Sequence, residues 1–167
     1  MAAAATYEPI ATTTLTSSQA SISFSSLGTY TDLRLVLTFT ATSSGGELDL
    51  QFNSDTGTNY SNTELYGTGA TAASARYTSQ SAIYIVGSVG ASTTIPSLAI
   101  IDIFSYRGST NKTILATWSS DRNGSGSVGR VVGLWRNTAA ITSVLVKLGS
   151  GSFASGTTAT IYGITAA

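Results

Sequence analysis

The chain has 167 residues, a length that fits one domain with its own hydrophobic core. Only 10% of the residues are charged, eight basic side chains balance eight acidic ones, and there is no cysteine and no histidine. This composition excludes an ordinary Ser/His triad, a cysteine nucleophile and a zinc site built on imidazole or thiolate. A neutral chain also lacks the field that would attract nucleic acid or an acidic membrane face, and no apolar run approaches the length of a membrane span.

The chain begins with an alanine-rich segment, Met1 to Pro9, that we expect to form an extended N-terminal arm. Pro9 cannot donate a hydrogen bond to a sheet, so it suits an arm or an edge strand. Tyr7 and Pro9 are candidate partner contacts, because such an arm can become ordered against another subunit. After the arm, Ala20 to Phe24 alternates polar and apolar residues and predicts a short strand.

The clearest strand pattern runs from Asp32 to Thr40, where large apolar residues occupy every second position. Glu47 to Asn53 repeats the alternation after a short Gly/Ser linker. Because successive side chains of a strand point to opposite faces, each run predicts a strand with one buried face. The short linker predicts that the two strands form a hairpin.

Periodicity is lost from Ser54 to Gln80, where Gly, Thr, Ala and Asn dominate. We expect a long loop, and loops of this length tend to be functional or to become ordered against a partner. Tyr60, Tyr66 and Tyr77 are candidate partner contacts within it, because tyrosine gives a large contact area at little entropic cost. The alternative is that these tyrosines cap the ends of the domain.

Four further strands are predicted, at Ser81 to Val86, Ser97 to Tyr106, Lys112 to Ser120 and Ser127 to Trp135. The second of these is apolar on both faces and is expected to be a central strand covered on each side. Asp102 lies in the middle of it and is expected to pair with an arginine, the alternative being that it faces a subunit contact. Trp118 and Trp135 lie within apolar strands and are expected in the core.

The last third of the chain predicts two more strands, Ile141 to Leu148 and Thr157 to Ile164, joined as a hairpin with a wide Gly/Ser tip. The total is about ten short strands with no segment of helical periodicity. We therefore expect an all-β protein, an antiparallel β-sandwich and most simply a jelly roll, as one domain over residues 10–167. An immunoglobulin-type sandwich is the nearest alternative.

No motif requires a particular chemistry, so we expect no enzyme activity, no cofactor and no metal site. Glu47 and Asp49 lie two apart on one strand face, which a solvated surface explains. Five residues fall at positions 1, 3, 5, 7 and 12 of a calcium-loop spacing, namely Asn53, Asp55, Gly57, Asn59 and Glu64. Thr58 replaces the glycine required at position 6, and no helices flank the loop, so an ordinary loop is favoured.

A resemblance covers nearly the whole chain. It is carried, in order, by YEPIATTTLTSSQASISFSSL, TYTDLRLVLTFTA, LQFNSDTGTNYSNTELYG and GLWRNTAAITSVLVKLGSGSFASGTTATIYGI. The most specific parts are LRLVLTF, FNSDTGTNYS and the closing TIYGI. Together these stretches resemble a family of small virion structural proteins of tailed bacteriophages, including cyanophages.

The resemblance implies a jelly-roll protein of the virion, with no catalytic residues to carry over. We expect a cement, or decoration, protein on the capsid surface, with the major capsid protein as its partner. A homotrimer is expected, because lattice sites of local threefold symmetry select that state. Removing residues 2–9 is then expected to weaken capsid binding and leave the fold intact. The alternative is a tail or head fibre module that binds host glycans through Tyr66, Tyr77, Tyr84 or Trp118.

Overall fold

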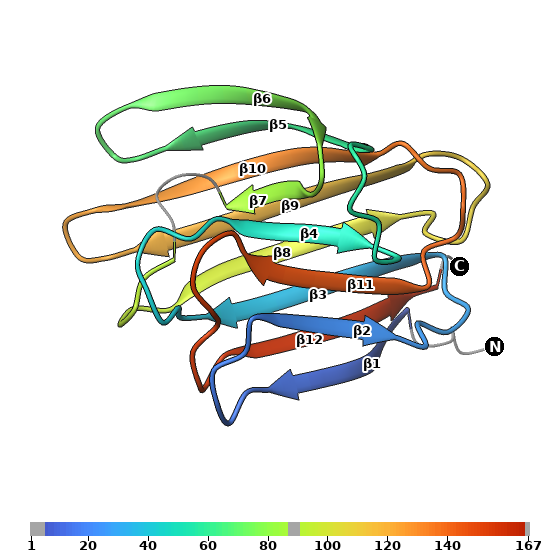
Figure 1. Ribbon diagram of the computed structural model, residues 1–167, viewed down its shortest axis with the longest axis horizontal. Helices are drawn as coiled ribbons and strands as arrows, with labels where there is room; N and C mark the ends of the chain where they lie inside the picture. The colour runs from blue at the N-terminus through green and yellow to red at the C-terminus, as the bar shows by residue number, and fades with distance from the viewer. Residues whose placement is uncertain (1–5, 87–90, 166–167) are drawn as a thin grey trace.

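The computed structural model describes residues 6–86 and 91–165, and the regular secondary structure in these ranges is entirely β-strand. Twelve antiparallel strands there form two sheets that face each other across one core (Figure 1). The predicted antiparallel β-sandwich is therefore confirmed, with two strands more than the roughly ten expected. No helix in the described ranges is long and apolar enough to cross a membrane.

The larger sheet has the strand order β1-β12-β3-β8-β9-β10-β5-β6, and the smaller sheet has the order β2-β11-β4-β7. The strands of the larger sheet, in that order, are Tyr7–Thr14, Thr158–Ile164, Asp32–Phe39, Ser97–Phe104, Lys112–Asp121, Gly126–Trp135, Tyr60–Gly67 and Ala72–Gln80. The strands of the smaller sheet, in that order, are Ser21–Ser25, Ser143–Leu148, Leu48–Phe52 and Ile83–Val86.

Alternating side chains of the two sheets build one hydrophobic core. Leu35 of β3 and Leu50 of β4 are both completely buried, one from each sheet. Trp118 of β9 and Trp135 of β10 are also buried, as the sequence predicts. Because each strand has period two, the same alternation that fills the core leaves the opposite face of each strand outside it.

The two predicted hairpins are wrong. β3 pairs with β12 and β8 in the larger sheet, whereas β4 pairs with β11 and β7 in the smaller one. Likewise β11 lies in the smaller sheet and β12 in the larger, so the chain crosses the core between them (Figure 1). Alternation predicts that each strand has a buried face, but strands of both sheets point their apolar rows at the same core. The pattern therefore does not tell which sheet a strand joins.

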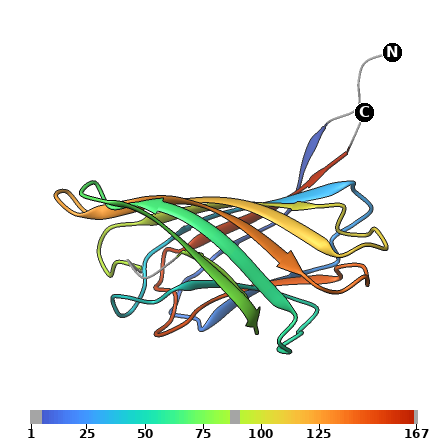
Figure 2. The same ribbon diagram turned by 90° about the horizontal axis from the view of Figure 1, so that it is seen from above.

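The predicted long loop from Ser54 to Gln80 is also wrong, because most of it forms the hairpin β5–β6. Together with the hairpin β9–β10, it extends the larger sheet beyond β8 (Figures 1 and 2). The edge strand β7 of the smaller sheet contacts β9, β10 and β5. The strand signal was missed because the inward positions of β5 include Asn62 and Glu64, so the apolar alternation is absent.

The strand β8 is central, with β3 and β9 as its neighbours, but only one of its faces is covered. Leu98 and Phe104 on the other face are exposed, contrary to the expectation of a strand covered on each side. The expected partner of Asp102 is confirmed as Arg34, which lies opposite it on β3. The Arg34 Nε and Nη2 atoms donate to the two carboxylate oxygens at 2.5 and 2.9 Å.

Candidate interaction surface

The side of the larger sheet that faces away from the core, here called the outer face, exposes large apolar side chains. Leu65 is 62% exposed, Val128 56% and Val132 53%, and they lie on the adjacent strands β5 and β10. Leu98 and Phe104 of β8 add to them, with Leu115 of β9 half-buried between. Single exposed apolar side chains are ordinary, but a contiguous set marks a site of interaction.

Strand register makes this set contiguous. Val132 lies opposite Leu115 of β9 on one side and Thr63 of β5 on the other. Arg130, two residues earlier, lies directly opposite Leu65. Directly opposite residues of an antiparallel pair project on the same face with Cβ atoms roughly 5 Å apart. Val132 and Leu115 are therefore direct neighbours on the outer face, and Leu65 lies diagonally across from both Val128 and Val132.

Few charges interrupt this surface. Arg34 and Asp102 lie on it but neutralise each other in their bidentate ion pair. Arg130 of β10 and Arg76 of β6 are exposed, and no ion pair engages either one among the described residues. The outer face is therefore apolar and threonine-rich, with two free cations at the side formed by β10, β5 and β6.

Tyr7 and Pro9 belong to β1, the edge strand of the larger sheet. They pair with Ile164 and Tyr162 of β12, so the expected free arm does not extend to residue 9. The rest of that arm, residues 1–5, lies outside the described residues. Pro9 is exposed beside an irregularity in the pairing, which suits a residue without an N–H group. Deleting residues 2–9 would remove these pairs and expose part of β12.

Tyr60 lies in the core and not in an exposed loop. It is completely buried and stacks on Trp135 with ring centroids 6.3 Å apart. Its hydroxyl accepts from the Phe52 N–H at 3.0 Å and lies 3.1 Å from the Asp55 carbonyl oxygen. Burial raises the pKa of Tyr60 to about 12. The structure thus leaves no surface of Tyr60 for a partner.

Tyr66 and Tyr77 are half-buried on the core side of the β5–β6 hairpin. The ring of Tyr77 meets that of Tyr84 of β7 edge to face, with centroids 5.2 Å apart. The Tyr84 hydroxyl donates to Gln80 at 2.8 Å. These aromatic groups join the hairpin to the smaller sheet. Trp118 is 1% exposed, so it cannot join them in a platform for sugar rings.

Two carboxylates are buried where the hairpin meets the smaller sheet, namely Asp49 of β4 and Glu64 of β5. Burial raises the pKa of Asp49 to about 6, with nearby Lys147 opposing and Glu47 adding to the effect. Burial also raises the pKa of Glu64, against a hydrogen bond from Tyr77 that favours its charged form. The prediction that Asp49 lies on a solvated face is wrong, because its side of β4 is covered.

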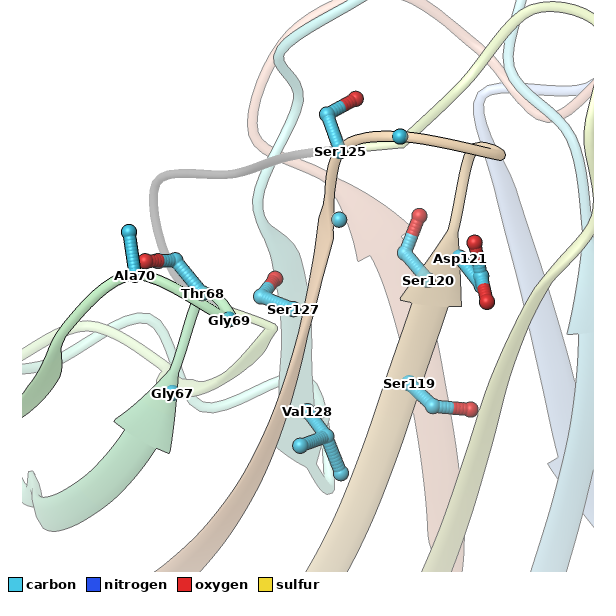
Figure 3. Close-up of a pocket in the computed structure, with 12 residues that line it drawn as sticks. Gly67, Thr68, Gly69, Ala70, Ser119, Ser120, Asp121, Ser125, Ser127 and Val128 are labelled. Carbon is cyan, nitrogen blue, oxygen red and sulfur yellow. The ribbon is translucent and has the colours of Figure 1, made fainter.

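A pocket of about 620 Å³ opens between the β5–β6 turn and the β9–β10 turn (Figure 3). Its lining is mostly glycine and hydroxyl groups, including Ser120, Ser125 and Ser127. Asp121 is its one carboxylate, and one of its oxygens accepts the Asn123 N–H at 2.9 Å. The described lining thus lacks the carboxylate pair that glycoside hydrolysis requires.

The side chains with calcium-loop spacing are engaged in separate hydrogen bonds, since Asp55 accepts from Asn59 Nδ2 within its own turn whereas Asn53 binds a different loop. Asn53 accepts the N–H groups of Thr142 and Ser143, and Asp55 accepts Gly57 N–H and Trp135 Nε1. The Trp135 hydrogen bond is the main cause of the lowered pKa of Asp55. Within residues 6–86 and 91–165, no three Asp or Glu side chains lie close enough to hold an ion.

Comparison with protein-family models, curated proteins and solved structures finds no match to this chain. The outer face is therefore identified as a candidate interaction surface from the geometry of this chain alone. The sequence reasoning did not select the residues Leu65, Val128, Arg130 and Val132 as candidate contacts. Three of these residues lie in the run Val128 to Leu134, which is the signal that could have revealed them. In this run, large outward side chains alternate with inward glycine and valine.

Proposed function

We propose that this protein is a structural component of a tailed-phage particle, a cement protein that binds the outer capsid lattice and stabilises the shell. The observation that carries the proposal is the outer face, a broad apolar surface of low charge on a rigid sheet. Such a surface loses few hydrated charges when another protein covers it. The resemblance of the sequence to virion structural proteins points to the same role.

We further propose that eight of the strands are a jelly roll. The groups β1-β12-β3-β8 and β2-β11-β4-β7 form the two sheets, and among these eight strands every connection except β4 to β7 crosses from one sheet to the other. Two four-stranded sheets with crossings of this kind are the jelly-roll arrangement. The hairpins β5–β6 and β9–β10 would then be insertions that widen one sheet and with it the outer face.

In this role the partner is the major capsid protein, and the attached form is a homotrimer at positions of local threefold symmetry. A cement protein binds many copies of one lattice surface, so a modest affinity per contact is multiplied over a trimer. Sedimentation analysis of the purified protein should therefore give three times the mass of the chain. A protein that is monomeric both in solution and on shells would contradict the proposed trimer.

The test of the function is binding of the purified protein, in parallel, to phage shells that lack it and to a glycan panel. Stoichiometric co-sedimentation with shells and no glycan retention is the result we expect. Glycan retention without shell binding would contradict the proposal and make the protein a fibre module. Salt and concentration should be matched in the two arms, because both alter weak surface contacts.

A further inference from the structure

The half of the outer face formed by β9, β10, β5 and β6, here called the basic half, differs from the rest in charge. The outward side chains there include Leu65, Val128 and Val132, each more than half exposed. Arg130 lies between the two valines on β10, and Arg76 lies opposite Thr63 on the neighbouring hairpin. A guanidinium with apolar neighbours on both sides is placed where docking would remove it from water.

No acidic side chain among the described residues of the basic half forms an ion pair with Arg130 or Arg76. The inward Glu64 lies on the other side of the sheet. Among the described strands of the basic half, Asp121 at the end of β9 is the one outward carboxylate, and it accepts the Asn123 N–H of its own turn. When the basic half is covered, each guanidinium must therefore find its carboxylate on the partner, because burying an unpaired charge is costly.

This charge pattern selects among possible partners. A second copy docked on the same surface by a twofold axis would bring equal charges together with no carboxylates between them. Two arginines are also too few to hold a nucleic acid or an anionic membrane, which need larger clusters of cations. A different protein with an apolar surface and exposed carboxylates fits both features of the basic half.

We propose that the basic half is the surface that docks on the particle, against an apolar surface of the shell subunit in which carboxylates meet Arg130 and Arg76. This inference rests on the proposed function, since it names the contact by which the cement protein would bind. It assigns the two arginines to specificity and the apolar side chains to affinity. The opposite sheet would then face the outside of the particle.

Three single variants, Arg130→Glu, Val132→Ser and Arg107→Glu, test the proposal in co-sedimentation with phage shells that lack the protein. The first should weaken binding by at least about tenfold, because it places like charges in a desolvated contact. The second should weaken it by less, since it removes apolar area alone. The control, Arg107→Glu, makes the same change of net charge on an exposed loop at the end of the sandwich and should bind as the wild type does.

The outcomes separate the two proposals. Circular dichroism and thermal unfolding first establish that each variant is folded. Wild-type binding that all three variants retain would overturn the basic half as the contact and leave the cement function standing. No wild-type binding would overturn the function, and the assignment of the contact with it. If the wild type self-associates and Arg130→Glu strengthens this self-association, the partner would be a second copy of the chain, which contradicts the proposal of a different protein.

Discussion

Asp49 is a carboxylate that the fold covers without giving both of its oxygens a partner. Its side chain is 7% exposed, and Oδ1 makes no hydrogen bond within the described residues. Burial raises the pKa of Asp49 from 3.8 to about 6, so the folded protein holds this proton more tightly than the unfolded chain does. Stability linked to Asp49 is therefore fully present below about pH 4 and is lost as the pH rises through about 6.

We predict that Asp49→Asn stabilises the protein at pH 7 by up to roughly 3 kcal/mol, the free energy that corresponds to this difference in pKa. Urea unfolding of the wild type and the variant between pH 4 and pH 8 measures the effect. The difference in stability should grow between pH 4 and pH 6 and then stay level. A difference that does not depend on pH would show that folding does not raise the pKa of Asp49.

The ion pair between Arg34 and Asp102 offers a second residue-scale test. The two side chains are 35% and 19% exposed, so water screens the pair and limits its contribution. We predict that Asp102→Ala lowers the free energy of unfolding by about 1 kcal/mol, most of it recovered as coupling in a cycle with Arg34→Ala. Additive single effects in that cycle would contradict a stabilising bridge.

At the scale of single residues, the sequence predicted the environment of a side chain correctly where its neighbours in the sequence form an apolar strand. Asp102 inside an apolar run needed a cation, and the tryptophans within apolar strands had to be buried. Tyr60 was misplaced because the strand that carries it, β5, was not recognised, and Asp49 because its side of β4 was taken to face solvent. A side chain is exposed or buried according to elements that can lie far along the chain, and a local pattern does not contain that information.

At the scale of elements, a residue of β10 approaches a side chain of β9 closely on the core side of the sheet. Gly129 of β10 lies opposite Trp118, and a Cβ atom at Gly129 would lie 2.7 Å from the indole ring. The glycine therefore makes room for the largest side chain of the core. Gly67 of β5, in the same sheet, has no atom nearer than 3.7 Å to the corresponding position.

We predict that Gly129→Ala destabilises the protein by about 1 to 3 kcal/mol, because the indole ring must move within a close-packed core. Gly67→Ala is the matched control and should change stability by less than about 0.5 kcal/mol. Thermal or urea unfolding of both variants, with tryptophan fluorescence as the probe, measures the two effects. Equal stability of the two variants would contradict a tight contact between Gly129 and Trp118.

The elements also show where sequence patterns stop being informative. Alternation located the strands of the core, including β3 and β8, within a few residues. It did not predict that β3 and β4 belong to different sheets, since pairing depends on partners distant in the chain. It missed β6 because this edge strand is mostly small and polar residues, with Ala73 and Ala75 on the side toward the core.

For the whole molecule, the outer face is the feature that the sequence did not reveal. Its side chains come from strands that are far apart in the sequence, such as β3 with Arg34 and β10 with Val132, and only the sheet order brings them together. The sequence did indicate a neutral surface suited to contact with another protein. The structure adds a candidate surface for such a contact, on the side of the sandwich opposite the smaller sheet.

The most direct test of the proposed cement function is a cryo-EM map of phage particles assembled in the presence of this protein. Our account predicts two-sheet density on the capsid surface, repeated at positions of local threefold symmetry, with β9, β10, β5 and β6 turned toward the shell. Acidic groups of the shell subunit should then lie against Arg130 and Arg76. Density for this chain in a tail or head fibre, with none on the capsid surface, would contradict the account.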